Sequence, residues 1–159
     1  MTERHYWDTT AWVGYVAEIN GAAGPMSGLM SGVERGNIEL LFSAVTLAET
    51  LFRPEARPSR PWPDPHDLDS IFDAPGLLLV QIDREVGELA RRLRRTYDLK
   101  VPDALHLACA AYHNADYLIT EDKALLAMPR DVIRRRDDTF LKIRRHSELA
   151  GSLFEQGKA

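Results

Sequence analysis

The sequence predicts an α/β fold in which helices cover both faces of a mostly parallel β-sheet. Strand signals alternate with helix signals along the chain, and this alternation is typical of parallel sheets. Two strand signals, Ile38–Ser43 and Gly76–Ile82, are short and mainly apolar, as in strands that are buried on both faces. With 159 residues and 45% hydrophobic content, the chain has the size and apolar surface of one domain.

In the first half of the chain, glycine and proline separate the predicted elements. Asn20-Gly21 and Gly24-Pro25 end the first helix, because these residues favour turns over helix. Thr46 follows the second strand and is expected to cap the next helix through its hydroxyl. In order, we expect a strand at Arg4–Trp7, a helix from Thr9, a helix at Met26–Arg35, a strand at Ile38–Ser43 and a helix at Leu47–Arg53.

A proline-rich segment at about residues 53–66 interrupts this pattern. It holds five of the nine prolines of the chain, and proline is excluded from helix interiors and central strands. Neither flank carries a complete core, so we expect a stiff, exposed loop within a single domain that spans residues 1–159. Trp62 in this loop is either a contact residue or an anchor packed on the body.

The second half of the chain contains an amphipathic helix and a buried helix. Asp83–Tyr97 has an apolar face with arginines opposite, which predicts an amphipathic helix. The segment from Val101 to His113 has Pro102 near its start and is apolar nearly all round, which predicts a central, buried helix. We also expect a helix at Asp67–Phe72, strands at Gly76–Ile82 and Asp116–Thr120, a helix at Glu121–Ala127, an edge strand at Asp131–Arg135 and a final amphipathic helix spaced by Phe140, Ile143, Ser147, Ala150 and Phe154.

Composition excludes several classes of protein. The single cysteine, Cys109, cannot form an internal disulfide, and the N-terminus has no apolar signal-peptide core. No apolar run approaches the roughly 20 residues that a membrane-spanning helix needs, so we expect a cytoplasmic protein without membrane association. The net charge of −4 argues against a surface coated in basic charge for nucleic acid. Arginine clusters at Arg91–Arg95, Arg134–Arg136 and Arg144–Arg145 are either solvated faces or a phosphate-binding rim.

Four acidic residues, Asp8, Glu49, Asp103 and Asp122, follow predicted strands or begin nearby helices. Each also has a structural explanation. Asp8 can cap the first helix, and Glu49 can complete a capping box with Thr46. Asp103 and Asp122 suit the positive end of a helix dipole.

Their joint placement favours a metal site. The ends of parallel strands share one edge of an open α/β sheet, where ligands bind. Converging carboxylates repel one another unless a cation neutralises them. Oxygen ligands suit Mg²⁺ or Mn²⁺ rather than zinc, and such ions position phosphate oxygens and activate water.

Four segments resemble the motifs of PIN domains. Asp8-Thr9-Thr10-Ala11-Trp12 looks like the DTS-A opening of that family, and Thr46-Leu47-Ala48-Glu49 resembles its second motif. Val101–Ala108 is similar to the D-ALHLA helix, and Ala115–Asp122 looks like the AD-LVT-D ending. The match follows the family order over nearly the whole chain. Size and pattern resemble the VapC-type toxins of bacterial and archaeal toxin–antitoxin pairs.

The resemblance implies a three-layer α/β/α sandwich, with a central, mostly parallel sheet of four to five strands, and a metal-dependent ribonuclease. It assigns the family's supporting hydroxyl to Thr120, and we expect Thr9 and His106 to support the site as well. His106 lies one turn after Asp103 on the same helix face, and it either transfers a proton or orients a carboxylate. The implied catalytic residues and ligands of Mg²⁺ or Mn²⁺ are Asp8, Glu49, Asp103 and Asp122.

We therefore expect an endoribonuclease that hydrolyses RNA phosphodiester bonds, and that is the toxin of a toxin–antitoxin pair with a cognate antitoxin as partner. Asp8 and Asp103 are expected to be the main metal ligands, with Glu49 and Asp122 completing the site. Family resemblance and base rate favour a homodimer. Two alternatives stay open. One is a non-catalytic module that binds an antitoxin or RNA and uses the acids only as caps; the other is a structure-specific DNA nuclease.

Overall fold

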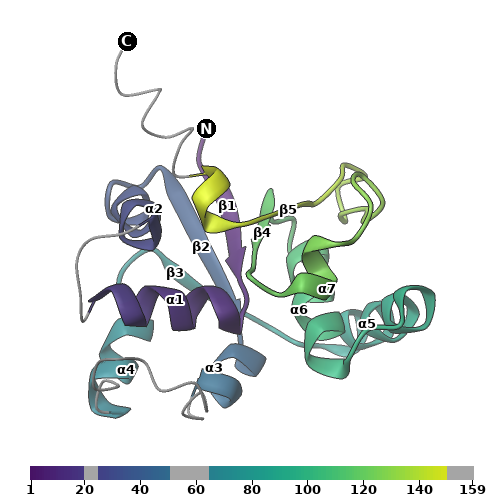
Figure 1. Ribbon diagram of the computed structural model, residues 1–159, viewed down its shortest axis with the longest axis horizontal. Helices are drawn as coiled ribbons and strands as arrows, with labels where there is room; N and C mark the ends of the chain where they lie inside the picture. The colour runs from purple at the N-terminus through teal and green to yellow at the C-terminus, as the bar shows by residue number, and fades with distance from the viewer. Residues whose placement is uncertain (20–24, 51–64, 150–159) are drawn as a thin grey trace.

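The computed structural model describes residues 1–19, 25–50 and 65–149, which form three layers around one β-sheet (Figure 1). The sheet has five strands in the order β3-β2-β1-β4-β5, and all neighbouring strands are parallel. This confirms the predicted α/β/α fold and parallel sheet. The strands are β1 (Glu3–Trp7), β2 (Ile38–Ser43), β3 (Leu77–Val80), β4 (Tyr117–Ile119) and β5 (Lys142–Arg144).

Helices cover both faces of the sheet, and Figure 1 shows α1 and α2 on one side with α5 and α6 on the other. The described helices are α1 (Thr9–Ile19), α2 (Pro25–Glu34), α3 (Ala44–Thr50), α4 (Pro65–Phe72), α5 (Arg84–Tyr97), α6 (Val101–Tyr112) and α7 (Lys123–Leu126). Within the described ranges, none of the helices combines the length and apolar character needed to cross a membrane.

Alternation along the strands divides the core between the two faces. Tyr6 and Leu118 belong to the cluster beneath α5 and α6, whereas Trp7 and Ile119 belong to the cluster beneath α1 and α2. All four side chains are fully buried. Adjacent strand residues thus point to opposite faces, as β geometry requires.

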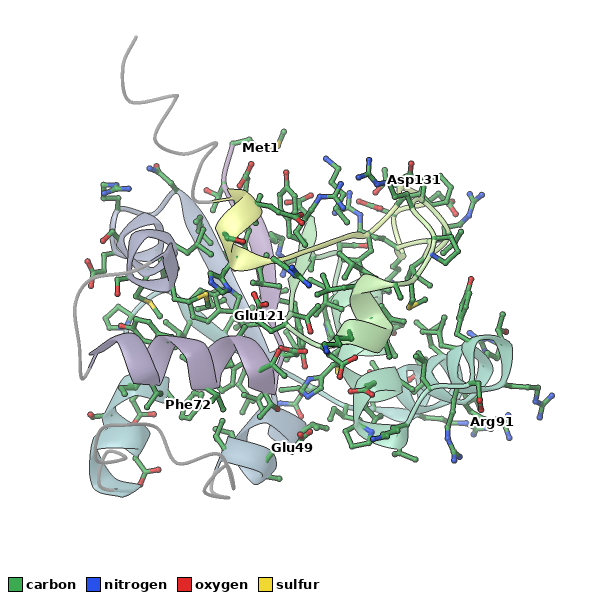
Figure 2. The ribbon with its side chains drawn as sticks, in the orientation of Figure 1. Met1, Glu49, Phe72, Arg91, Glu121 and Asp131 are labelled. Atoms are coloured by element: carbon green, nitrogen blue, oxygen red, sulfur yellow. The ribbon has the colours of Figure 1, made fainter. Side chains whose placement is uncertain are left out.

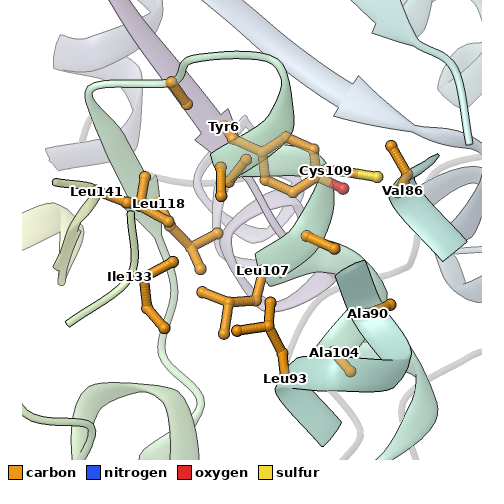
Figure 3. Packing of buried hydrophobic residues seen from close by; sticks show 14 of the residues in the cluster. Tyr6, Val86, Ala90, Leu93, Ala104, Leu107, Cys109, Leu118, Ile133 and Leu141 are labelled. Atoms are coloured by element: carbon orange, nitrogen blue, oxygen red, sulfur yellow. The ribbon is translucent and has the colours of Figure 1, made fainter. Parts of the chain in front are cut away.

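Helix α6 lies at the centre of one core, as the sequence predicts. Its buried residues run through almost every turn, from Ala104 to Ala111. Figure 3 shows Leu107 of this helix packed near Leu93 of α5, Leu118 of β4 and Tyr6 of β1. A buried helix places its first turn firmly against the sheet, and that turn carries Asp103.

Two predictions in the C-terminal part are wrong. Asp131–Arg135 forms no strand, and only Arg134 pairs with Phe140 in an isolated bridge. The edge strand is β5 instead, within the segment predicted to be helical. Leu141 and Ile143 alternate with Lys142 and Arg144, and this period of two outweighs the helical spacing. Helix follows only at residues 146–149, and the rest of the predicted final helix lies outside the described residues.

Two further elements, one strand and one helix, also differ from expectation. The run at Gly76–Ile82 forms a shorter strand, β3, in which Leu78 and Leu79 are each 42% exposed, because β3 is the outermost strand of the sheet. Helix α3 begins at Ala44, so Thr46 lies inside the helix and cannot be its N-cap.

Most of the proline-rich segment, including Trp62, lies outside the described residues. Its last two residues are described and are helical, because α4 begins at Pro65 rather than at Asp67. Proline suits the first turn of a helix, where its missing N–H costs no hydrogen bond.

Candidate active site

The four predicted acids lie around the C-terminal edge of the sheet. Asp8 follows β1 directly, Glu49 lies near the end of α3, and Asp122 follows β4. Asp103 is in the first turn of α6. Because all five strands are parallel, their carboxyl ends meet at one edge, and Figure 2 shows Glu49 and Glu121 at that end of the sheet.

Asp8 is almost completely buried, with an exposure of 2%, and its carboxylate accepts three hydrogen bonds. Thr120 Oγ1 donates to Oδ2 at 2.5 Å, and Thr10 Oγ1 donates to Oδ1 at 2.6 Å. The backbone N–H of Ala11 donates to Oδ1 at 3.0 Å, so Asp8 also caps α1. Burial raises the pKa of Asp8, and the donors from Thr10 and Thr120 oppose that rise.

The other three acids affect the pKa of Asp103. Burial has the largest effect and raises the pKa of Asp103, and the negative charge of Asp122 raises it further. Asp8 and Glu49 act in the same direction, whereas His106 lowers the pKa of Asp103. The three other acids thus all act on the pKa of Asp103 in the direction expected of neighbouring negative charges.

The segment after β4 is tied to Asp8 through hydroxyl groups. Thr120 Oγ1 accepts from the backbone N–H of Asp122 at 2.9 Å while it donates to Asp8. Thr10 Oγ1 accepts from the N–H of Glu121 at 2.8 Å. Sequence reasoning assigned no role to Thr10, although Thr10 lies in the segment that resembles the DTS-A opening and could have been identified there. Asp122 itself caps α7 through Oδ1, which accepts from two backbone N–H groups.

His106 contacts Glu49 and Thr9 from beneath the site. Its Nε2 lies 3.3 Å from Glu49 Oε1 and 3.2 Å from Thr9 Oγ1. The capping-box interpretation of Glu49 is therefore wrong, since Thr46 is inside α3 and the Glu49 carboxylate contacts His106. On the other side of the ring, Nδ1 lies 2.8 Å from the hydroxyl of Tyr6, a residue that strand alternation identifies only as core.

The donor chemistry of the site fits a hard divalent cation, although the side chains do not form a closed cage. Within the described ranges, no three His, Cys, Asp or Glu side chains are placed to enclose a metal ion together. Mg²⁺ usually takes only one or two carboxylates directly and keeps several waters. Burial raises the pKa of Asp8, and burial together with the neighbouring acids raises the pKa of Asp103. A bound cation would favour the charged form of both carboxylates.

The arginines at Arg134–Arg136 have structural roles. Arg135 forms ion pairs with Asp116 at 2.7 Å and with Asp137 at 3.3 Å. The guanidinium groups of its two neighbours lie over aromatic rings, Arg134 over Phe140 and Arg136 over Tyr112. This cluster therefore stabilises the segment between α7 and β5.

A cavity of about 260 Å³ lies between α7, residues 128–133 and the β5 region. None of the four acids lines it. Its connection to the site is through the backbone, because the carbonyl of the lining residue Arg144 accepts a hydrogen bond from the N–H of Thr120 at 3.1 Å. The ion pairs of Arg144 with Glu148 and of Arg145 with Glu121 are both 3.8 Å long. Arg144 Nη1 also donates a hydrogen bond to the carbonyl of Ile143 at 2.8 Å. The charged lining residues are Arg130, Lys142, Arg144, Arg145, Asp131 and Glu148.

Comparison with known proteins gives one family and several similar folds. A family model described as PIN domain matches residues 6–131. No curated protein matches the chain in sequence. A toxin–antitoxin complex from Klebsiella pneumoniae contains a chain that is 20% identical, with a TM-score of 0.54, covering 79% of this chain and 92% of that one.

Two further solved structures have similar folds. VapBC2 from Rickettsia felis, bound to a DNA fragment from their promoter, is 16% identical with a TM-score of 0.58, and the match covers 89% of this chain and 98% of that one. VapBC-1 from nontypeable Haemophilus influenzae is 14% identical with a TM-score of 0.56, covering 91% and 98%. At these identities the likeness concerns the fold alone.

Proposed function

The chain belongs to the PIN-domain family, and we propose that it is a divalent-metal-dependent endoribonuclease. The observation that carries this proposal is the convergence of Asp8, Glu49, Asp103 and Asp122 at one edge of the sheet, where each of the other acids affects the pKa of Asp103. Acids that only cap helices do not need to lie close enough to affect one another's pKa. The acids of a phosphodiesterase do, because several carboxylates must hold cations against an anionic substrate.

In this proposal, Asp8 and Asp103 hold Mg²⁺ or Mn²⁺, and Glu49 and Asp122 complete the site. The ion, when bound, supplies positive charge to a phosphate oxygen and lowers the pKa of a water molecule. Thr10 and Thr120 fix the Asp8 carboxylate through their hydroxyl groups. Glu49, whose side chain is 38% exposed, orients the attacking water and accepts its proton on a carboxylate oxygen. The water oxygen then bonds to phosphorus as the bond from phosphorus to the leaving ribose oxygen breaks, and that oxygen takes a proton from solvent.

The direct test uses the purified protein with single-stranded RNA and with DNA of the same sequence. We expect Mg²⁺ or Mn²⁺ to support cleavage of the RNA at internal positions and EDTA to stop it. Cleavage of DNA in preference to RNA would favour a structure-specific DNA nuclease. Binding of RNA without cleavage under any metal condition would favour a non-catalytic module, in which Asp8 and Asp122 act only as the helix caps that they also form.

We also propose that the cavity beside β5 binds a phosphate of the RNA strand. Its four cationic side chains outnumber its two acids, and guanidinium groups match phosphate geometry. Arg144→Gln and Arg145→Gln should each raise KM for RNA roughly threefold to tenfold and reduce the salt dependence of binding by about 0.7 in log–log slope, with kcat nearly unchanged.

Arg35→Gln is the matched control for these two variants. Arg35 follows α2 and is exposed at the opposite edge of the sheet, before β2, and its loss changes the net charge equally. An equal rise of KM in the control would show that the effect comes from the change in net charge. It would contradict binding of an RNA phosphate in the cavity.

The similar folds named above are components of toxin–antitoxin complexes, and we extend that role to this chain as part of the proposal. A ribonuclease that acts on cellular RNA in the cytoplasm requires restraint, which a cognate antitoxin would supply by covering the acidic edge. The proposal includes a homodimer, since cyclic dimers are the commonest oligomers.

A further inference from the structure

Four side chains from four different elements form a continuous chain of contacts beneath the acids. Ser43 Oγ, at the end of β2, lies 2.8 Å from the hydroxyl of Tyr6 in β1. That hydroxyl lies 2.8 Å from His106 Nδ1 in α6, and His106 Nε2 lies 3.3 Å from Glu49 Oε1 in α3. Ser43 and Tyr6 are fully buried and His106 is 2% exposed, so the chain is shielded from water up to Glu49.

The chemistry of the last member determines the direction of every hydrogen bond. A carboxylate only accepts hydrogen bonds, so His106 Nε2 must carry the proton that it donates to Glu49. In a neutral imidazole the other nitrogen is then an acceptor, and the Tyr6 hydroxyl must donate to Nδ1. The remaining lone pairs of the Tyr6 oxygen accept from the hydroxyl of Ser43.

Burial makes this arrangement stable. The Tyr6 side chain is fully buried, and a phenol away from water keeps its proton and remains a donor. The opposite tautomer of His106 would direct the Nε2 lone pair at the Glu49 carboxylate, and two facing acceptors repel each other. Thr9 Oγ1, at 3.2 Å from Nε2, is a second acceptor for the same N–H.

We propose that Tyr6 is a positioning residue that fixes the proton of His106 on Nε2 and thereby holds Glu49 at the acidic edge. This inference rests on the proposed ribonuclease function for its catalytic consequence. The Glu49 side chain is 38% exposed, and a fixed N–H donor on His106 holds one of its oxygens in place. The other oxygen stays available for water or cation.

The first test measures the tautomer directly. In the full-length protein labelled with ¹⁵N-histidine, ring chemical shifts of His106 should show a protonated Nε2 and an unprotonated Nδ1. Tyr6→Phe removes only the hydroxyl that occupies Nδ1, and the spectrum should shift toward a mixture of tautomers. Nδ1–H as the main form in the wild type, or protons on both nitrogens at neutral pH, would overturn the proposal.

The second test measures the effect on cleavage. Tyr6→Phe should lower kcat about tenfold to a hundredfold, as loss of a partner behind a site histidine commonly does, while KM for RNA changes little. In a Glu49→Gln background, the same substitution should cause no further loss, because Tyr6 acts through Glu49. A full additional loss in that background would assign Tyr6 a merely structural role and contradict the proposal.

Tyr112→Phe is the matched control, on the same helix as His106. Its ring packs at the same core, and its hydroxyl makes no hydrogen bond with the part of the chain that the structure describes. It should leave both the His106 spectrum and kcat unchanged, and an equal loss of kcat in this control would overturn the assignment of Tyr6. The tautomer measurement needs no activity, so absence of RNA cleavage with the expected tautomer would refute the ribonuclease function and leave the hydrogen-bond chain intact.

Discussion

Asp103→Asn is expected to reduce RNA cleavage about a hundredfold to a thousandfold, the range seen when one preorganised group at a reacting centre is removed, while the protein remains folded. Asparagine has nearly the shape of aspartate and suits the start of a helix. It lacks the charge that a hard cation requires. Within the described residues, the Asp103 carboxylate accepts no hydrogen bond at the start of α6, where Lys100 is the N-cap and Pro102 lies in the first turn.

The same substitution should leave the free energy of unfolding unchanged or increase it in metal-free buffer. Burial and the charges of Asp122, Asp8 and Glu49 raise the pKa of Asp103 in the folded protein, so its charged form is disfavoured there. The wild type should consequently gain stability from this group as the pH falls through the folded pKa. The variant, which has no such group, should lack that gain.

Thermal unfolding with and without Mn²⁺ measures both effects. Metal that binds only the folded state raises Tm by mass action, and we expect Asp103→Asn to lose most of this response. Asp73→Asn, at an exposed position just after α4, should retain both the response and the cleavage rate. Unfolding of the Asp103 variant, or cleavage at the wild-type rate, would identify Asp103 as a structural cap.

The placement of most of the acids at strand ends and helix starts was predictable from sequence, because such ends and starts are local features. Asp83 ends one apolar run and begins the amphipathic α5, whose cap it proves to be. The parallel sheet then places Asp8 and Asp122 at the same edge without any further information. Their coupling to Asp103 requires only that α6 be buried, and its nearly continuous apolar sequence predicts that burial.

The contacts beneath the acids were not predictable in this way. His106 and Glu49 are separated by 57 positions, and Tyr6 and His106 by 100. Strand alternation assigns Tyr6 to the core but does not show that its hydroxyl has buried partners. The prediction for the β5 segment was wrong for another reason. The spacing of Leu141 and Ile143 is compatible with both a strand and a helix.

Growth arrest is the second large effect that we expect. Expression of the wild-type chain in a bacterial host should stop growth, and co-expression of the proposed cognate antitoxin should restore growth. Asp8→Asn should be harmless by itself. Its amide oxygen can still accept from Ala11 and Thr10, as Asp8 Oδ1 does, so the cap of α1 is retained while the metal ligand is lost.

The comparison between these two proteins separates chemistry from binding, because both should fold and accumulate equally, as an immunoblot would verify. A non-catalytic module that sequesters a cellular partner would keep its surface in Asp8→Asn and would arrest growth as strongly as the wild type. Arrest by the variant would therefore refute toxicity through RNA hydrolysis. Arrest by the wild type alone, relieved by the co-expressed antitoxin, would support a restrained ribonuclease whose acidic edge is the surface that the partner must cover.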